Sequence, residues 1–108
     1  MSIYWVVLFI AVITEVAWAL SLKWVQVSGG WAAMTVAGVL TITNMVMLSY
    51  AMRGIPVGTA YGVWTGLGAV GVCVMGIVLF KDPVFFSRLF FMGLIVLGVV
   101  GLKWVSPA

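Results

Sequence analysis

The stretch IYWVVLFIAVITEVAWALSL, residues 3–22, decides the fold class of this chain. It carries a single charged residue, Glu15, and a helix that crosses a bilayer needs about 20 mainly apolar residues. No lysine or arginine comes before Lys23 and an acid interrupts the apolar run, which is not the pattern of a cleavable signal peptide. We therefore expect residues 3–22 to remain in the protein as a membrane-spanning helix.

The composition extends this expectation to the whole chain. Of its 108 residues, 66% are hydrophobic and 6% are charged, whereas soluble domains carry about 25% charged residues because their surface faces water. Lipid is therefore the expected solvent for most of the surface. The length leaves room for one domain, which we expect to span residues 1–108.

Three further apolar stretches of similar length follow, at residues 31–52, 57–80 and 85–104. Each break between the stretches combines a charged residue with glycine or proline, which is typical of connecting loops. A closed β-barrel can also cross a bilayer, but these stretches lack the alternation of its strands. The sequence thus predicts an all-α membrane protein with four transmembrane helices per subunit.

The basic residues are spread singly along the chain, so they fit interfacial anchors and do not indicate a nucleic-acid partner. Four spans place Arg53 and Lys103 on one side of the membrane, with Lys23, Lys81 and Arg88 on the other. This near balance gives almost no orientation by the positive-inside rule. Either the chain inserts both ways up, which permits an antiparallel dimer of identical chains, or a partner or another feature sets one orientation.

Glu15 is the residue in the spans that most strongly indicates a function, because an ionisable group inside hydrocarbon is costly. No lysine or arginine lies at matching depth, so Glu15 is a candidate site for a proton, for a cation, or for both in alternation. The other interpretation is a permanently protonated glutamate that hydrogen-bonds between helices. Trp18 and Val12 lie one turn away on the same face, and Trp18 can offer its indole N–H or its π-face.

Asn44 is the only carboxamide inside the four predicted spans, and its amide needs hydrogen-bond partners in lipid. Glu15 is an available partner, although an amide that simply joins two helices is the alternative. In the third span Tyr61, Trp64 and Gly68 share one helix face. The two aromatic residues could line a cation cavity together with Trp18.

Glycines mark the third and fourth spans as packing surfaces. Gly62 and Gly66 form a GxxxG pattern that allows close helix approach, and with Gly68 they favour close packing or bending. The fourth span has no central ionisable group and contains Gly93 and Gly98. Its expected role is association with another copy.

Nothing in the sequence indicates catalysis. There is no histidine, and the lone Cys73 lies in an apolar run where packing is its expected role. No metal-ligand cluster, Ser/His/Asp set or phosphate-binding loop is present. We expect neither an enzyme nor a bound cofactor or metal.

Four motifs resemble those of the small multidrug resistance transporters, and the resemblance covers essentially the whole chain. They are EVAWALSLK at residues 15–23, IPVGTAYGVWTGLGAVG at 55–71, KDP at 81–83 and GLK at 101–103. WALSLK and the terminal GLK are most similar to the guanidinium-exporter subtype. The resemblance implies a bacterial inner-membrane protein that forms an antiparallel dimer and exchanges protons for a cation.

The resemblance also implies roles for individual residues. Glu15 corresponds to the carboxylate that binds proton and substrate in competition, and Trp18, Tyr61 and Trp64 correspond to the aromatic residues of the binding site. Residues 93–100 correspond to a dimer contact, and residues 62–68 to a glycine-rich bend that supports alternating access.

Two positions depart from the guanidinium-exporter pattern, since glycine is usual at the position of Val12 and serine is common at that of Asn44. Both changes favour a substituted guanidinium such as guanylurea, or a subunit of a paired heterodimer. The expected function is proton-coupled export of small cations, with the lipid bilayer and an identical or paralogous second subunit as partners. The alternatives are a broad quaternary-ammonium exporter and a structural or regulatory subunit that does not transport.

Overall fold

The computed structural model describes residues 2–106, which form four helices and no strands. They are α1 (Ile3–Ser28), α2 (Trp31–Ala51), α3 (Val57–Phe80) and α4 (Phe86–Val105). Each is long and apolar enough to cross a membrane, which confirms the predicted all-α architecture with four spans. α1 continues beyond residue 22 and stops at Gly29, whose φ of 66° is readily adopted only by a residue without a Cβ. The other helix ends lie within one residue of the predicted spans.

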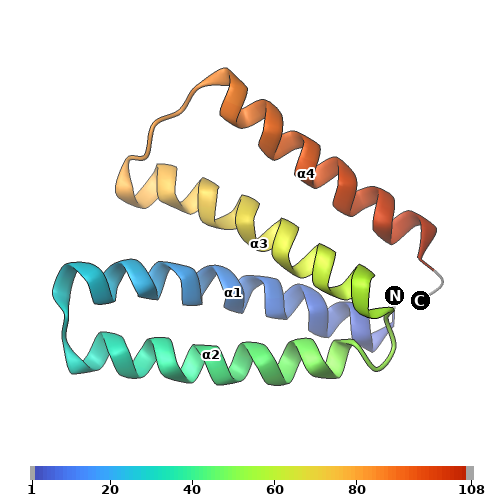
Figure 1. Cartoon of the computed structure of the whole chain (residues 1–108), viewed down its shortest axis with the longest axis horizontal. Helices are drawn as coiled ribbons and strands as arrows, with labels where there is room; N and C mark the ends of the chain where they lie inside the picture. The colour runs from blue at the N-terminus through green and yellow to red at the C-terminus, as the bar shows by residue number, and fades with distance from the viewer. Residues whose placement is uncertain (1, 107–108) are drawn as a thin grey trace.

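α1 packs against α2 and α3, and α3 contacts all three other helices. The backbone of α4 comes close to α3 alone within residues 2–106, and α4 meets α1 only through side chains such as Lys103 on the Trp5 ring. Figure 1 shows α1 and α2 side by side, α3 inclined to them, and α4 diverging from α3 toward the α3–α4 connection. The extents of 44 × 35 × 18 Å describe a slab, whose long dimension fits a bilayer of about 40–45 Å with its headgroups.

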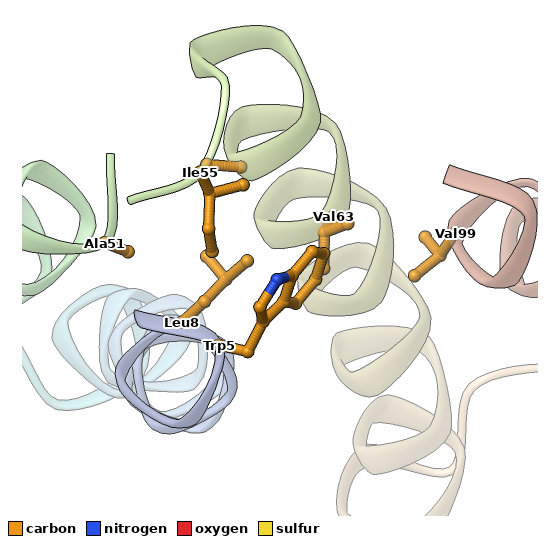
Figure 2. Close-up of a cluster of buried hydrophobic side chains, with 7 residues drawn as sticks. Trp5, Leu8, Ala51, Ile55, Val63 and Val99 are labelled. Carbon is orange, nitrogen blue, oxygen red and sulfur yellow. The ribbon is translucent and has the colours of Figure 1, made fainter. Parts of the chain in front are cut away.

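The apolar core lies where the N-terminal half of α1 meets the α2–α3 connection (Figure 2). Its buried members come from all four helices and this connection: Trp5, Leu8, Ala51, Ile55, Ala60, Val63 and Val99. The ring of Tyr4 lies against Gly54, in the space that any Cβ at that position would need. This close contact and the core fix α1 against its two neighbours, and so set the position of Glu15 further along the same helix.

The outer surface differs from that of a soluble protein because it exposes many large apolar side chains. Large apolar side chains such as Trp31, Phe86 and Trp104 are 82–86% exposed. Such an extensive exposed apolar surface is stable only against lipid. All three lie at helix ends, where tryptophan in particular anchors proteins at the membrane interface.

The α3–α4 connection is held by its polar groups. Lys81 has a φ of 55°, in the left-handed region, and the N–H of Asp82 donates to the carbonyl of Gly76 at 3.2 Å. Arg88 donates to the carbonyl of Pro83 at 2.8 Å and lies 3.9 Å from a carboxylate oxygen of Asp82. These contacts turn the chain sharply between the end of α3 and the start of α4.

Candidate functional site

A cavity of about 110 Å³ lies between the middle portions of α1, α2 and α3. α1 supplies Glu15 and Trp18, which share one face because they lie three residues apart. α3 supplies Trp64. The residues from α2 are Thr41, Asn44 and Met45. The structure therefore brings together four of the predicted site residues from three different helices.

Three of the residues that line the cavity carry a buried polar atom without a partner. Oε1 of Glu15, Oδ1 of Asn44 and the indole N–H of Trp64 are buried and have no hydrogen bond within residues 2–106. A buried polar group without a partner costs about 1–3 kcal/mol, so such groups are rare unless something else satisfies them. Two acceptors and one donor on lining residues are therefore candidates to bind a polar ligand beside this cavity.

The carboxyl group of Glu15 also has no cationic partner among residues 2–106. No lysine or arginine lines the cavity, and the one ion pair between described residues joins Arg88 to Asp82 in the α3–α4 connection. Glu15 is partly buried, with Oε1 fully covered, and its helix is a membrane span, where a carboxylate without a counter-charge is strongly unfavourable. Glu15 must therefore hold a proton, or its charge must be met by a cation from outside the chain.

Glycines of α3 leave space for the Glu15 side chain. A Cβ built on the buried Gly68 would lie 2.7 Å from Cγ of Glu15, closer than such atoms approach in real structures. One helical turn further, a Cβ on Gly71 would lie 2.6 Å from the side chain of Val16. The two glycines thus allow α3 to approach α1 closely at the level of the cavity.

Gly62 and Gly66, predicted as packing residues, face a different helix. A Cβ on Gly66 would lie 3.0 Å from Val99, and one on Gly62 would lie 3.2 Å from Leu102. Both contacts are with α4, so the GxxxG pattern lies in the α3–α4 contact and not beside the cavity. α3 is one continuous helix across this region.

Two of the predicted site residues lie outside the cavity. Tyr61 is 53% exposed, and its ring centroid is 5.8 Å from that of Trp64, so it contacts the cavity wall from outside. Val12 is buried and lines a separate groove with Val16, Leu67 and other residues of α1 and α3. Neither side chain belongs to the set that lines the Glu15 cavity in this conformation.

The remaining predicted residues, Gly93 and Gly98, lie in α4. A Cβ on Gly93 or Gly98 would meet nothing within 4 Å among the described residues, so both face away from the rest of the subunit.

Two residues that line the cavity, Thr41 and Met45, were not predicted. Thr41 lies one turn before Asn44, and this spacing could have indicated that it lines the same cavity. Its hydroxyl donates to the carbonyl of Ala37 at 2.8 Å. Met45 is one of many apolar residues in α2, so no pattern in the sequence distinguished it.

Comparison with known proteins gives a consistent result. The family model described as Small Multidrug Resistance protein matches residues 3–95. The Guanidinium exporter of Proteus vulgaris is 42% identical over 106 residues, which cover 94% of this chain and 98% of that protein. The Guanidinium exporter of Citrobacter freundii is 48% identical over 103 residues, covering 92% and 94%.

Proposed function

The chain belongs to the Small Multidrug Resistance protein family, and on this premise we propose that it exports a guanidinium-type cation in exchange for protons. As a member with four helices able to cross a membrane, it is a multi-pass transport protein of the bacterial inner membrane. The named activity of its relatives supports guanidinium itself as a substrate.

The observation that carries this proposal is the unpaired Glu15 carboxyl group in a small cavity with Asn44 and Trp64. A proton and a cation would compete for the same carboxylate, because either one compensates its charge. Competition at one group is enough to couple the two flows: the cation binds only after the proton leaves, and a returning proton displaces it. Trp18, also in the lining, would stack its ring on a planar cation.

The size of the cavity supports a small substrate. Pockets for drug-sized ligands measure about 300–1,000 Å³, and this one measures about 110 Å³. A planar guanidinium group suits the limited volume and the acceptors of Glu15 and Asn44 better than a bulky quaternary ammonium, which offers no N–H donor.

The polar atoms further favour a substituted guanidinium. A guanidinium group offers only donors, so it would satisfy Glu15 and Asn44 and leave the indole N–H of Trp64 without an acceptor. Guanylurea adds a carbonyl oxygen that could accept from Trp64. We therefore propose that guanylurea is transported at least as well as guanidinium.

An antiparallel dimer, with an identical or related chain, completes the proposal. It would place two copies of Glu15 at one central site, so that two protons could exchange for one monovalent cation. The net inward movement of one charge would then be driven by the membrane potential, at about 2.3 kcal/mol per 100 mV. The thin, slab-shaped subunit and the nearly balanced basic residues are consistent with this arrangement.

The proposal is tested with the purified chain in vesicles that are acidic inside. We expect saturable, gradient-driven uptake of guanidinium and guanylurea, and no uptake of tetrapropylammonium. Glu15→Gln should abolish this uptake, because the amide can neither exchange a proton nor compensate a cation. Asp82→Asn is the matched control, since it alters the other acidic residue, outside the cavity, and should retain uptake.

Uptake that persists in Glu15→Gln would exclude the role of Glu15, and uptake without a proton gradient would exclude coupled exchange. A chain that is inactive alone and active when reconstituted with a related subunit would identify a heterodimer. Efficient uptake of tetrapropylammonium would instead favour a broad quaternary-ammonium exporter.

A further inference from the structure

A second cavity, of about 330 Å³, lies between α1 and α4, away from Glu15. It exists because the backbone of α4 approaches only α3, so that a groove remains between α4 and α1 with Leu67 of α3 in its lining. Phe9 of α1 and Val99 and Val100 of α4 are also among the lining residues. Figure 1 shows α1 and α4 separated in this way by α3.

The groove has one charged end. Nζ of Lys103, in the last turn of α4, lies 4.2 Å from the centroid of the Trp5 ring. Lys103 is the only charged residue among the described residues that line the groove, and the exposed Trp104 lies beside it. Tryptophan and lysine at a helix end mark the membrane surface, whereas Phe9 and Val99 lie one helical turn deeper. The groove therefore changes from cationic at headgroup depth to apolar within the hydrocarbon.

This gradient matches an amphiphile with an anionic head. A lysine near the surface attracts anionic headgroups, and the apolar walls suit an acyl chain and disfavour ordered water. The second acidic residue of the chain, Asp82, lies in the α3–α4 connection and is already paired with Arg88. Among residues 2–106 the lysine thus has no acidic partner in its own groove, and the bilayer itself supplies anions at the right depth.

From this charge complementarity we infer that the α1–α4 groove is a binding site for an anionic phospholipid, with its phosphate at Lys103 and an acyl chain along Phe9, Leu67 and Val99. The site is separate from the Glu15 cavity and does not depend on the transported substrate. Its occupant would fill the space between α4 and the other helices that the packing of a single chain leaves open.

The test uses the whole chain in nanodiscs that contain phosphatidylglycerol or phosphatidylcholine, each with a photoreactive group on an acyl chain. We expect adducts near Phe9, Leu67 and Val99, with about a fivefold preference for phosphatidylglycerol, which corresponds to about 1 kcal/mol for one lysine. Lys103→Gln should remove the preference and Lys103→Arg should keep it. Lys23→Gln is the matched control, because it removes the same charge from a groove that also contains Asp82.

Equal labelling by the two lipids would overturn the inference, as would a preference that survives Lys103→Gln. Absence of adducts together with cross-links between subunits through Val100→Cys would assign the groove to a second copy. If Lys103→Gln fails to fold, the unaltered chain still provides the test. Its preference should fall when salt is raised to screen the lysine, and a preference insensitive to salt would contradict the proposed contact.

Discussion

At the scale of single residues, the site depends on a glycine as much as on an acid. Glu15 projects from α1 into a space that exists only because α3 presents Gly68 to it. Asn44 and Trp64 then place an acceptor and a donor around the carboxyl group, and neither is satisfied inside the subunit. The chemistry at Glu15 is therefore controlled by the shape of a neighbouring helix.

We predict that Gly68→Ala lowers the kcat/KM for guanidinium about tenfold. The added methyl group would lie 2.7 Å from Cγ of Glu15, so the carboxyl group must move, and overpacking of this kind costs about 1–3 kcal/mol. The measurement is initial uptake as a function of guanidinium concentration. Gly58→Ala is the matched control on the same helix, since a Cβ there meets nothing within 4 Å. Equal effects in the two variants would show that the close approach at Gly68 does not matter.

At the scale of elements, the end of α3 carries a backbone conformation that its sequence does not favour. Lys81 adopts a φ of 55°, which side chains with a Cβ reach only at a cost. The turn that follows directs α4 away from the α1–α2–α3 layer and is held by Asp82 and Arg88. This turn sets the direction of α4 and therefore the position of the α1–α4 groove.

We predict that Lys81→Gly makes the protein about 1 kcal/mol more stable than Lys81→Ala, because glycine enters the left-handed region without the Cβ penalty. Both substitutions remove the same charge, so their difference isolates the backbone effect. Unfolding in detergent, followed by circular dichroism, measures the free energy of unfolding. Identical unfolding of the two variants would mean that the left-handed turn is absent from the protein in solution.

At the scale of the whole molecule, the single subunit leaves much of each helix uncovered. It is 18 Å thick at its narrowest, and the backbone of α4 approaches one other helix only. Gly93 and Gly98 lie at two positions of α4 that no described residue of the subunit covers. Small residues on an open helix face allow two helices to approach in a membrane, which is consistent with the proposed dimer contact.

We predict that Gly98→Ile weakens dimerisation by about tenfold or more, since a bulky side chain at a close helix contact costs about 1–3 kcal/mol. Gly38→Ile in α2 is the control, because a Cβ at either glycine meets nothing within 4 Å in the subunit. Light scattering in detergent at several protein concentrations gives the dissociation constant. A dimer that tolerates Gly98→Ile as well as Gly38→Ile would place the contact elsewhere.

Several features could be predicted from the sequence because they depend on local quantities. The length and hydropathy of four stretches determined the four helices, and the cost of a charge in lipid drew attention to Glu15. The need of an amide for partners did the same for Asn44. The structure places Glu15, Asn44, Trp18 and Trp64 around one cavity, as helical spacing and chemistry had suggested.

Only the tertiary structure decided which helix faces meet. These helices are apolar on all faces. Hydrophobic periodicity therefore does not reveal how each helix is rotated about its axis or where it contacts its neighbour. Helical spacing placed Val12 on the face of Glu15, and the face shared with Trp64 together with the family resemblance suggested Tyr61 for the cavity. The packing of α1 on α3 turns Val12 into another groove and leaves Tyr61 outside the cavity. The same packing brings Gly68 to Glu15 and opens the groove at Lys103, because residues far apart in sequence meet only once rotation and tilt are set.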